Sequence, residues 1–219
     1  LSFKAGEASA FVVPEILAIP EDTLAGYRQS DNGIRHFDRV FEQILAKKAH
    51  TLPKEQELLL AQSQDATQGY SQIFTMFNNA DVKFPAITGE NGEELAVTHG
   101  NYISLMENQD RRIRRDAFLS LYSAYAQFSN TLAANFASNA KQAVFYARAR
   151  SYASSRQYYL GENEVPEAVY DNLLEAVHRR LGGMHRYAAL RKKALGLDEL
   201  HMYDLYVPLV KEADRQYSF

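Results

Sequence analysis

The chain has 219 residues, of which 46% are hydrophobic and 23% charged, a composition typical of a folded globular protein and not of a disordered one. Its formal net charge of −3 gives no support to a nucleic-acid-binding protein or to a protein held on a membrane surface. The absence of cysteine excludes disulfides and thiolate metal sites. It also permits a reducing compartment, so we expect a cytoplasmic location.

The two ends of the chain lie within patterned segments. It opens on Leu1 and ends on Ser218 and Phe219, where a serine stands as a helix cap with no helix after it. The apolar residues 11–19 are interrupted by Pro14 and have no basic leader, so they do not predict a secretory signal. We therefore expect this segment to be part of a longer protein.

Helical patterns fill the first eighty residues. Residues 1–29 predict short helices interrupted by Pro14 and Pro20. Apolar residues at helical spacing predict one amphipathic helix over 33–50 and a second over 53–79. Because only a few residues connect these two helices, we expect them to pack as an antiparallel hairpin.

The helical periodicity stops at Asp81. Two short apolar runs, 84–87 and 94–97, flank the pair Asn91 and Gly92. Both residues of that pair tolerate the positive φ that a two-residue type I′ turn requires. The pattern predicts a single small β-hairpin at about 82–98.

The stretch 101–160 contains neither glycine nor proline. Apolar residues recur through it every three or four positions, as Phe118, Leu121, Tyr125, Phe128, Leu132 and Phe136. This pattern predicts one very long central helix, from Asn108 or Asp110 to about Tyr158. Residues 117–140 carry no charge, but their many serine and asparagine side chains favour a helix buried in protein over a membrane span.

Another helix is predicted from Pro166 to just before Gly196, with its apolar stripe formed by Val169, Leu173, Val177, Leu181, Met184 and Leu190. Gly182 and Gly183 inside it predict a kink or a close helix crossing. The fold class expected is therefore all-α, multi-helical, with one β-hairpin. We expect residues 1–100 to form amino-terminal helical hairpins with the β-hairpin, and 101–219 to belong to a larger helical domain.

Few residues offer chemistry. Glu175, His178 and His185 lie near one helical face, but no His-Glu-x-x-His occurs, and one Glu-x-x-His does not make a metal site. The run 145–159 mixes aromatic residues with arginines, and helical spacing scatters them around the axis. Packing with outward-pointing arginines is the interpretation we favour there, over single-strand nucleic-acid binding. No catalytic and no metal-binding residue is predicted.

A polar strip on the long helix is the one substrate-site candidate. It comprises Asn135, Asn139, Gln142 and Tyr146, at spacings of four, three and four residues. Buried polar side chains require hydrogen-bond partners, which a bound peptide backbone or the neighbouring helices and water would supply. Both alternatives remain open from the sequence.

Four long stretches resemble a known family. They are FNNADVKFP at 77–85, LAVTHGNY at 95–102, Asp110 to Arg112 with Arg115, Ala117 and Phe118, and RKKALGLDELHMYDLY at 191–206. On these residues the sequence resembles the oligoendopeptidase F family of zinc metallopeptidases, which are helical enzymes related to thimet oligopeptidase.

The resemblance implies an enzyme that hydrolyses oligopeptides in a deep channel, with zinc as cofactor. In that family zinc is held by His-Glu-x-x-His and a downstream glutamate, and the glutamate between the histidines is the general base. We expect that motif beyond Phe219, so the segment alone should be inactive and its partners should be the peptide and the carboxy-terminal catalytic part. Neither nucleic acid nor a membrane is expected as a partner. The alternative is a stand-alone helical scaffold or protein-interaction module.

Overall fold

The computed structural model describes residues 2–210, and the predicted cap at Ser218 lies outside them. Helices dominate these residues, and their only sheet has two strands. The all-α prediction is confirmed. The chain forms two compact units, each built from two separate stretches. Among the described residues, the first comprises 2–74 and 134–167, and the second 75–133 and 168–210. The expected division at residue 100 stays a prediction.

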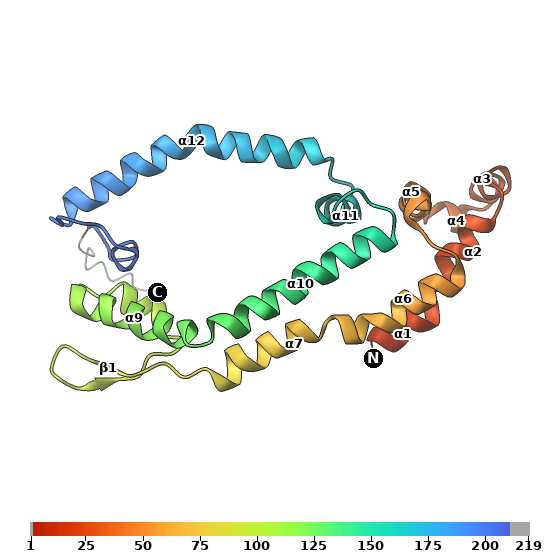
Figure 1. Ribbon diagram of the computed structural model, residues 1–219. Helices are drawn as coiled ribbons and strands as arrows, with labels where there is room; N and C mark the ends of the chain where they lie inside the picture. Colours follow the sequence, from red (N-terminus) through yellow and green to blue (C-terminus); the bar gives the residue numbers. More distant parts are fainter. Residues whose placement is uncertain (1, 211–219) are drawn as a thin grey trace, which may run out of the picture. The chain divides into compact units, whose positions relative to one another are not determined.

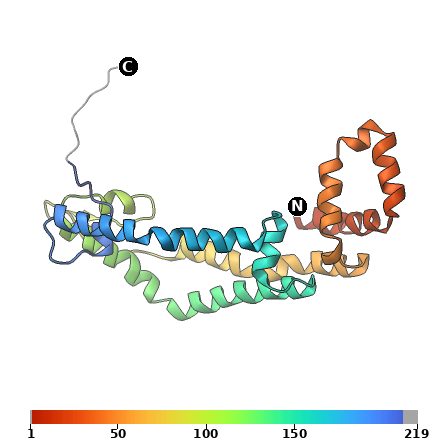
Figure 2. The ribbon, with the colours of Figure 1, turned by 90° about the horizontal axis from the view of Figure 1, so that it is seen from above.

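The first unit begins with short helices (Figure 2). They are α1 (Ser2–Ser9), α2 (Val12–Ala18), α3 (Glu21–Ser30), α4 (Asn32–Arg35) and α5 (Asp38–Ala46), followed by a 3₁₀ turn at Lys48–His50 and by α6 (Lys54–Thr67) and α7 (Gly69–Met76). Pro20 and Pro53 directly precede α3 and α6, and acidic residues fill the first turn of each helix. Prolines and acids suit that position because the first turn has free N–H groups and a positive dipole end.

Packing within this unit differs from the predicted helical hairpin. The main neighbour of α6 is α1, while α5 packs on α2 (Figure 1). Residues 32–50 also form two helices and a 3₁₀ turn in place of one helix. The side chain of Asp31 accepts hydrogen bonds from the N–H groups of Gly33 and Ile34 and so starts α4 separately.

The prediction of one very long central helix was wrong. The chain instead forms α9 (Arg111–Ala126), α10 (Ser129–Ala149) and α11 (Ser155–Glu162), with visible interruptions between them (Figure 1). The N–H of Phe128 bonds to the carbonyl of Tyr125, three residues back, which tightens the chain there. The ring of Phe128 packs against that of Phe77, 5.0 Å away between centroids. The helix therefore ends at a tertiary contact and not at a helix-breaking residue.

The second unit surrounds a small apolar core. Its elements are a π-helical turn (Phe77–Asp81), β1 (Ile87–Thr88), β2 (Glu94–Leu95), α8 (Tyr102–Met106), α9, α12 (Glu167–Ala194) and a 3₁₀ turn (Met202–Asp204). The core consists of buried Ile87, Val97, Ile113 and Ala117. These residues come from the hairpin, the segment after it and one face of α9, so burying them fixes the hairpin on α9.

The β-hairpin is confirmed, but the two-residue type I′ turn is not. The strands pair antiparallel, with Ile87 opposite Leu95. The N–H of Gly89 then donates to the carbonyl of Glu93 at 2.8 Å, which leaves a loop of three residues. Within that loop only Gly92 has positive φ, at 85°. This is the arrangement in which a type I turn is followed by one left-handed residue.

Helix α12 begins and ends as predicted. Gly196 has φ 64° and follows its last turn, where the N–H of Leu197 bonds back to the carbonyl of Lys192. At Gly182 and Gly183 an added Cβ would contact only the side chain of Arg186 among the described residues, so no close helix crossing occurs there. The apolar stripe of α12 is exposed along its whole length.

Candidate functional site

The predicted polar strip lies on α10, and its last member faces α6. Tyr146 is buried, and its hydroxyl lies 3.1 Å from the hydroxyl of Ser63 and 2.9 Å from that of Thr67. Both partners belong to α6, so Tyr146 joins two helices of the first unit. For this residue, bonding to a neighbouring helix is the alternative that the structure supports.

The other members of the strip are partly buried. Asn135 and Asn139 have intermediate exposure on the same side of α10. The side-chain oxygen Oε1 of Gln142 is buried and has no hydrogen-bond partner among the described residues. An unpaired buried oxygen is costly, so it marks a position where a water or a ligand donor would be favourable. A substrate role for Asn135, Asn139 and Gln142 stays a prediction.

A groove of about 660 Å³ follows a different face of α10. Its lining residues are Ala140, Lys141, Val144, Phe145, Arg148 and Ala149. Because successive residues of an α-helix are turned by about 100°, this groove lies on nearly the opposite side of α10 from the strip. Its apolar floor includes Phe145, which is 46% exposed, and a cation stands toward each end. Sequence reasoning missed this groove, although the spacing of Lys141, Val144, Phe145 and Arg148 was a readable signal.

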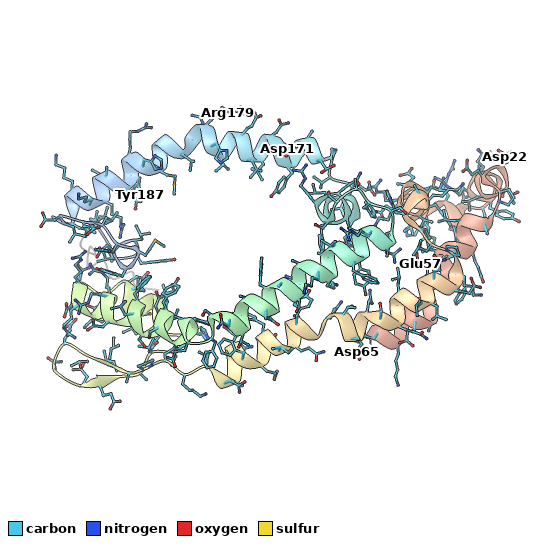
Figure 3. All side chains as sticks on the ribbon, in the orientation of Figure 1. Asp22, Glu57, Asp65, Asp171, Arg179 and Tyr187 are labelled. Carbon is cyan, nitrogen blue, oxygen red and sulfur yellow. The ribbon has the colours of Figure 1, made fainter. Side chains whose placement is uncertain are left out.

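A second polar cluster joins the 3₁₀ turn after α5 to the end of α10. Figure 3 labels Glu57 on α6. Arg150 donates to both carboxylate oxygens of this residue, at 2.7 and 2.8 Å. The ring nitrogen Nδ1 of His50 lies 2.8 Å from the carbonyl of Arg150, and its ring stacks on Tyr152 at 3.6 Å. The interpretation that the arginines of 145–159 point outward is therefore wrong for Arg150. Glu57 neutralises the charge of Arg150, so this cluster stabilises the contact of the end of α10 with α6 and with the turn at His50.

Burial sets the protonation of the tyrosine beside this cluster. Burial and the nearby carboxylate of Glu162 raise the pKa of Tyr158 to about 12. The phenol is therefore neutral at physiological pH and does not act as a base. A cavity of about 490 Å³ borders Tyr158, Glu57 and Arg150. Because Arg150 and Glu57 are paired with each other, neither offers an unpaired charge to a ligand in this cavity.

In the second unit, three arginines hold one turn. The buried carboxylate of Asp204 accepts hydrogen bonds from Arg111 and Arg114, and the side chain of Arg191 donates to the backbone carbonyls of Asp204 and Val207. Burial raises the pKa of Asp204. The hydrogen bonds from Arg111, the His201 N–H and Arg114 lower it by more, so the pKa of this carboxyl is about 2. The carboxylate is thus charged at physiological pH and serves to fix the turn.

No zinc site is formed by the described residues. Across residues 2–210 no three or more histidine, aspartate or glutamate side chains are placed to hold a metal ion. Glu175, His178 and His185 all lie exposed along α12, and Glu175 accepts a hydrogen bond from Arg179 at 3.1 Å. A separation of ten residues puts His185 about 15 Å along the axis from Glu175, too far for one ion.

Membrane insertion finds no support in the helices that the structure describes. None of them combines the length and the apolar character that a membrane span requires. The uncharged stretch 117–140 is divided between α9 and α10.

Two family models match the chain. The model described as Oligopeptidase F matches residues 15–84, and the model described as Peptidase family M3 matches residues 104–218. The second match alone spans more than half of the chain. The two matches flank the hairpin and cover the resembling stretches at 110–118 and 191–206 and most of the one at 77–85, while 95–102 lies between them.

Individual relatives match along the whole chain. Oligopeptidase PepF of Bacillus subtilis is 41% identical over 216 residues, which cover 99% of this chain and 32% of that protein. The oligoendopeptidase F homolog of Lactococcus lactis subsp. lactis is 43% identical over 95% of this chain and 35% of its own length. The crystal structure of oligoendopeptidase-F from Enterococcus faecium superposes with a TM-score of 0.93 at 41% identity, over 97% of this chain and 41% of that one. This chain thus spans about a third of the length of these curated relatives.

Proposed function

This chain belongs to peptidase family M3 and to its oligoendopeptidase F members, and from that membership we propose that it forms part of a zinc-dependent endopeptidase that hydrolyses oligopeptides. The observation that carries the proposal is the 41% identity to Oligopeptidase PepF over 99% of the chain. Identity maintained over so long a stretch supports a shared role for the helices. The location proposed for the whole protein is the cytoplasm.

The role proposed for these residues is to build a helical lobe and part of the wall of the substrate channel. The described residues do not form a zinc site, so no catalytic step is assigned to them. Zinc is proposed as the cofactor of the whole protein, together with ligands and a general base contributed by other residues. The chain's own contribution is to position a peptide by contacts along α10, where Asn135 and Asn139 are partly buried.

The alternative of a stand-alone helical scaffold has only the lack of a recognised catalytic motif in its favour. Family membership supports the peptidase instead, because its relatives over this stretch carry the names oligopeptidase and oligoendopeptidase. A scaffold would bind a protein partner without hydrolysing peptides. The two functions therefore differ in one direct assay.

The test compares the product of the whole gene with this 219-residue chain. Each is incubated with an internally quenched oligopeptide, with and without a chelator, and zinc is measured after dialysis. We expect cleavage and about one zinc per molecule only in the whole gene product, with activity lost on chelation and restored by zinc. A whole gene product that leaves the peptide intact would contradict the proposal, and cleavage by the 219-residue chain would contradict the assignment of catalysis to other residues.

A further inference from the structure

The groove on α10 carries positive charge without any negative charge beside it. Lys141 and Arg148 are the only charged residues of α10, and no aspartate or glutamate occurs anywhere in 117–161. Seven residues separate the two cations, so they lie on one face about 10 Å apart along the helix axis. Between them the exposed side chains of Val144 and Phe145 form an apolar floor.

These cations differ from other arginines of the same molecule. Arg150 binds Glu57, Arg156 binds Glu167, and on α12 Arg179 binds Glu175. Within residues 2–210, neither Lys141 nor Arg148 takes part in an ion pair or a side-chain hydrogen bond. Both side chains are exposed at the groove and are free to meet a ligand's carboxylate.

We propose that this groove binds the acidic side chains of an oligopeptide, with an apolar residue of the peptide resting on Phe145. The inference rests on the proposed function and adds a second peptide-binding surface, on the face of α10 away from Asn135 and Asn139. This surface would prefer peptides with aspartate or glutamate on both sides of an apolar residue. Alternate side chains of an extended peptide share one face, so acids placed two positions before and two positions after an apolar residue all face the groove. These acids lie about 13 Å apart, which the long lysine and arginine side chains can reach from helix positions about 10 Å apart. An ammonium and a guanidinium are suitable partners for carboxylates, and aromatic contact adds apolar burial.

The affinity expected for acidic peptides follows from the solvent exposure of Lys141 and Arg148. Ion pairs at a solvent-exposed surface are weak, and each corresponds to roughly a two- to fivefold change in affinity. Two such pairs acting together correspond to roughly four- to twentyfold. Salt screens exposed charges, so the preference for acidic peptides should shrink as ionic strength rises from about 0.05 to 0.5 M.

The test measures binding by this 219-residue chain, without cleavage. Two fluorescent hexapeptides are compared by anisotropy, one with glutamates two positions before and two positions after a phenylalanine and one with glutamines in their place. Both are acetylated and amidated, so that side chains supply the only carboxylates. We expect the glutamate peptide to bind the wild-type chain roughly four- to twentyfold more tightly, and K141Q with R148Q to remove that difference. The matched control R179Q, which removes an exposed arginine of α12, should preserve it.

A charge-reversed pair makes the test independent of folding effects. K141E with R148E should prefer a peptide carrying lysines at the two glutamate positions, which a misfolded variant would not do. Equal binding of the glutamate and glutamine peptides by the wild-type chain would overturn the proposal. So would a preference for the glutamate peptide that R179Q removes equally. Because no step depends on hydrolysis, these results are separate from the peptidase assay on the whole gene product.

Discussion

Arg114 and Asp204 form an ion pair from which water is excluded on both sides. Nη2 of Arg114 lies 2.9 Å from Oδ1 of Asp204, and their side chains are 3% and 0% exposed. Arg114 also donates to the backbone carbonyls of Asn108, Gln109 and Tyr203. One side chain therefore joins the start of α9 to the 3₁₀ turn that follows α12. Arg114 therefore stabilises the packing of these two elements in the second unit.

Replacing Arg114 should be far more harmful than replacing Arg111, although both bind Asp204. Arg114→Met removes the buried donor to the Asp204 carboxylate, which keeps only Arg111 and the His201 N–H among the described residues, and it leaves three carbonyls without this donor. We expect it to lower the free energy of unfolding by about 3 kcal/mol. Arg111 is 42% exposed, so water replaces it, and Arg111→Met should cost about 1 kcal/mol. Urea unfolding of both variants measures the difference. Equal losses would contradict the special role of the buried pair.

The charge of Asp204 should make stability depend on acid pH. Its pKa in the folded chain is about 2, below the ordinary value of about 3.9 for an unfolded aspartate. A lowered folded pKa contributes stability that is complete above about pH 4 and is lost as the pH falls toward 2, in total about 2 kcal/mol. Unfolding free energies of the wild type and Asp204→Asn, measured from pH 6 to pH 2, should converge as the pH falls. A constant difference would show that ionisation is not responsible.

The turn of the β-hairpin gives a third prediction. Gly92 has φ 85°, which costs an L-residue about 1–2 kcal/mol, so Gly92→Ala should destabilise the chain by that amount. Gly100 is the matched control, because a Cβ there would make only an ordinary contact with Thr98. Gly100→Ala should change stability by less than about 1 kcal/mol. Thermal unfolding separates the two variants, and a neutral Gly92→Ala would be the contrary result.

The sequence was sufficient for features that depend on neighbouring residues. Pro166 and Glu167 open α12 and Gly196 closes it, because caps and dipole effects act within one turn. The all-α class and the position of the β-hairpin were readable for the same reason. The family resemblance of 77–85 and 191–206 was likewise present in the chain itself, and the family models confirm it.

Features that depend on tertiary packing were not readable. Nothing local marks the break at Phe128, which coincides with contact to Phe77 from another element. The pairs of Arg150 with Glu57 and of Arg114 with Asp204 join residues 93 and 90 positions apart. A periodic pattern shows which side chains share a helix face, but it does not show which neighbour that face meets. The strip containing Tyr146 therefore permitted both a channel wall and a helix contact.

Kinetic measurements on the whole gene product can distinguish residues of the strip that bind substrate from residues that only pack against other helices. Tyr146→Phe removes a hydroxyl bonded to Ser63 and Thr67, so it should lower stability by about 1 kcal/mol and leave KM unchanged. If Asn139 lines the channel, Asn139→Leu should raise KM. Peptide cleavage rates and urea unfolding are measured on both variants. An unchanged KM with lowered stability for Asn139→Leu would assign that residue to packing.

The exposed stripe of α12 gives the last prediction. Its residues Leu173 and Val177 are 59% and 50% exposed, and apolar surface of this extent drives association in water. We expect the 219-residue chain to self-associate, and Leu173→Glu with Val177→Glu to shift it toward the monomer in light scattering. The control Arg186→Glu changes the net charge by the same amount on the other side of α12. It should leave association intact.

The same surface should bind the rest of the protein. A separately produced portion beginning after Phe219 should compete with self-association, because both processes bury the stripe of α12. Mixing the two portions should then give a complex with some zinc-dependent peptidase activity, and the double glutamate variant should form less of it. The Arg186→Glu control should form as much complex as the wild type. A chain that stays monomeric and does not bind the second portion would contradict this prediction. That result would favour an independently folded scaffold, because no partner would then bury the stripe of α12.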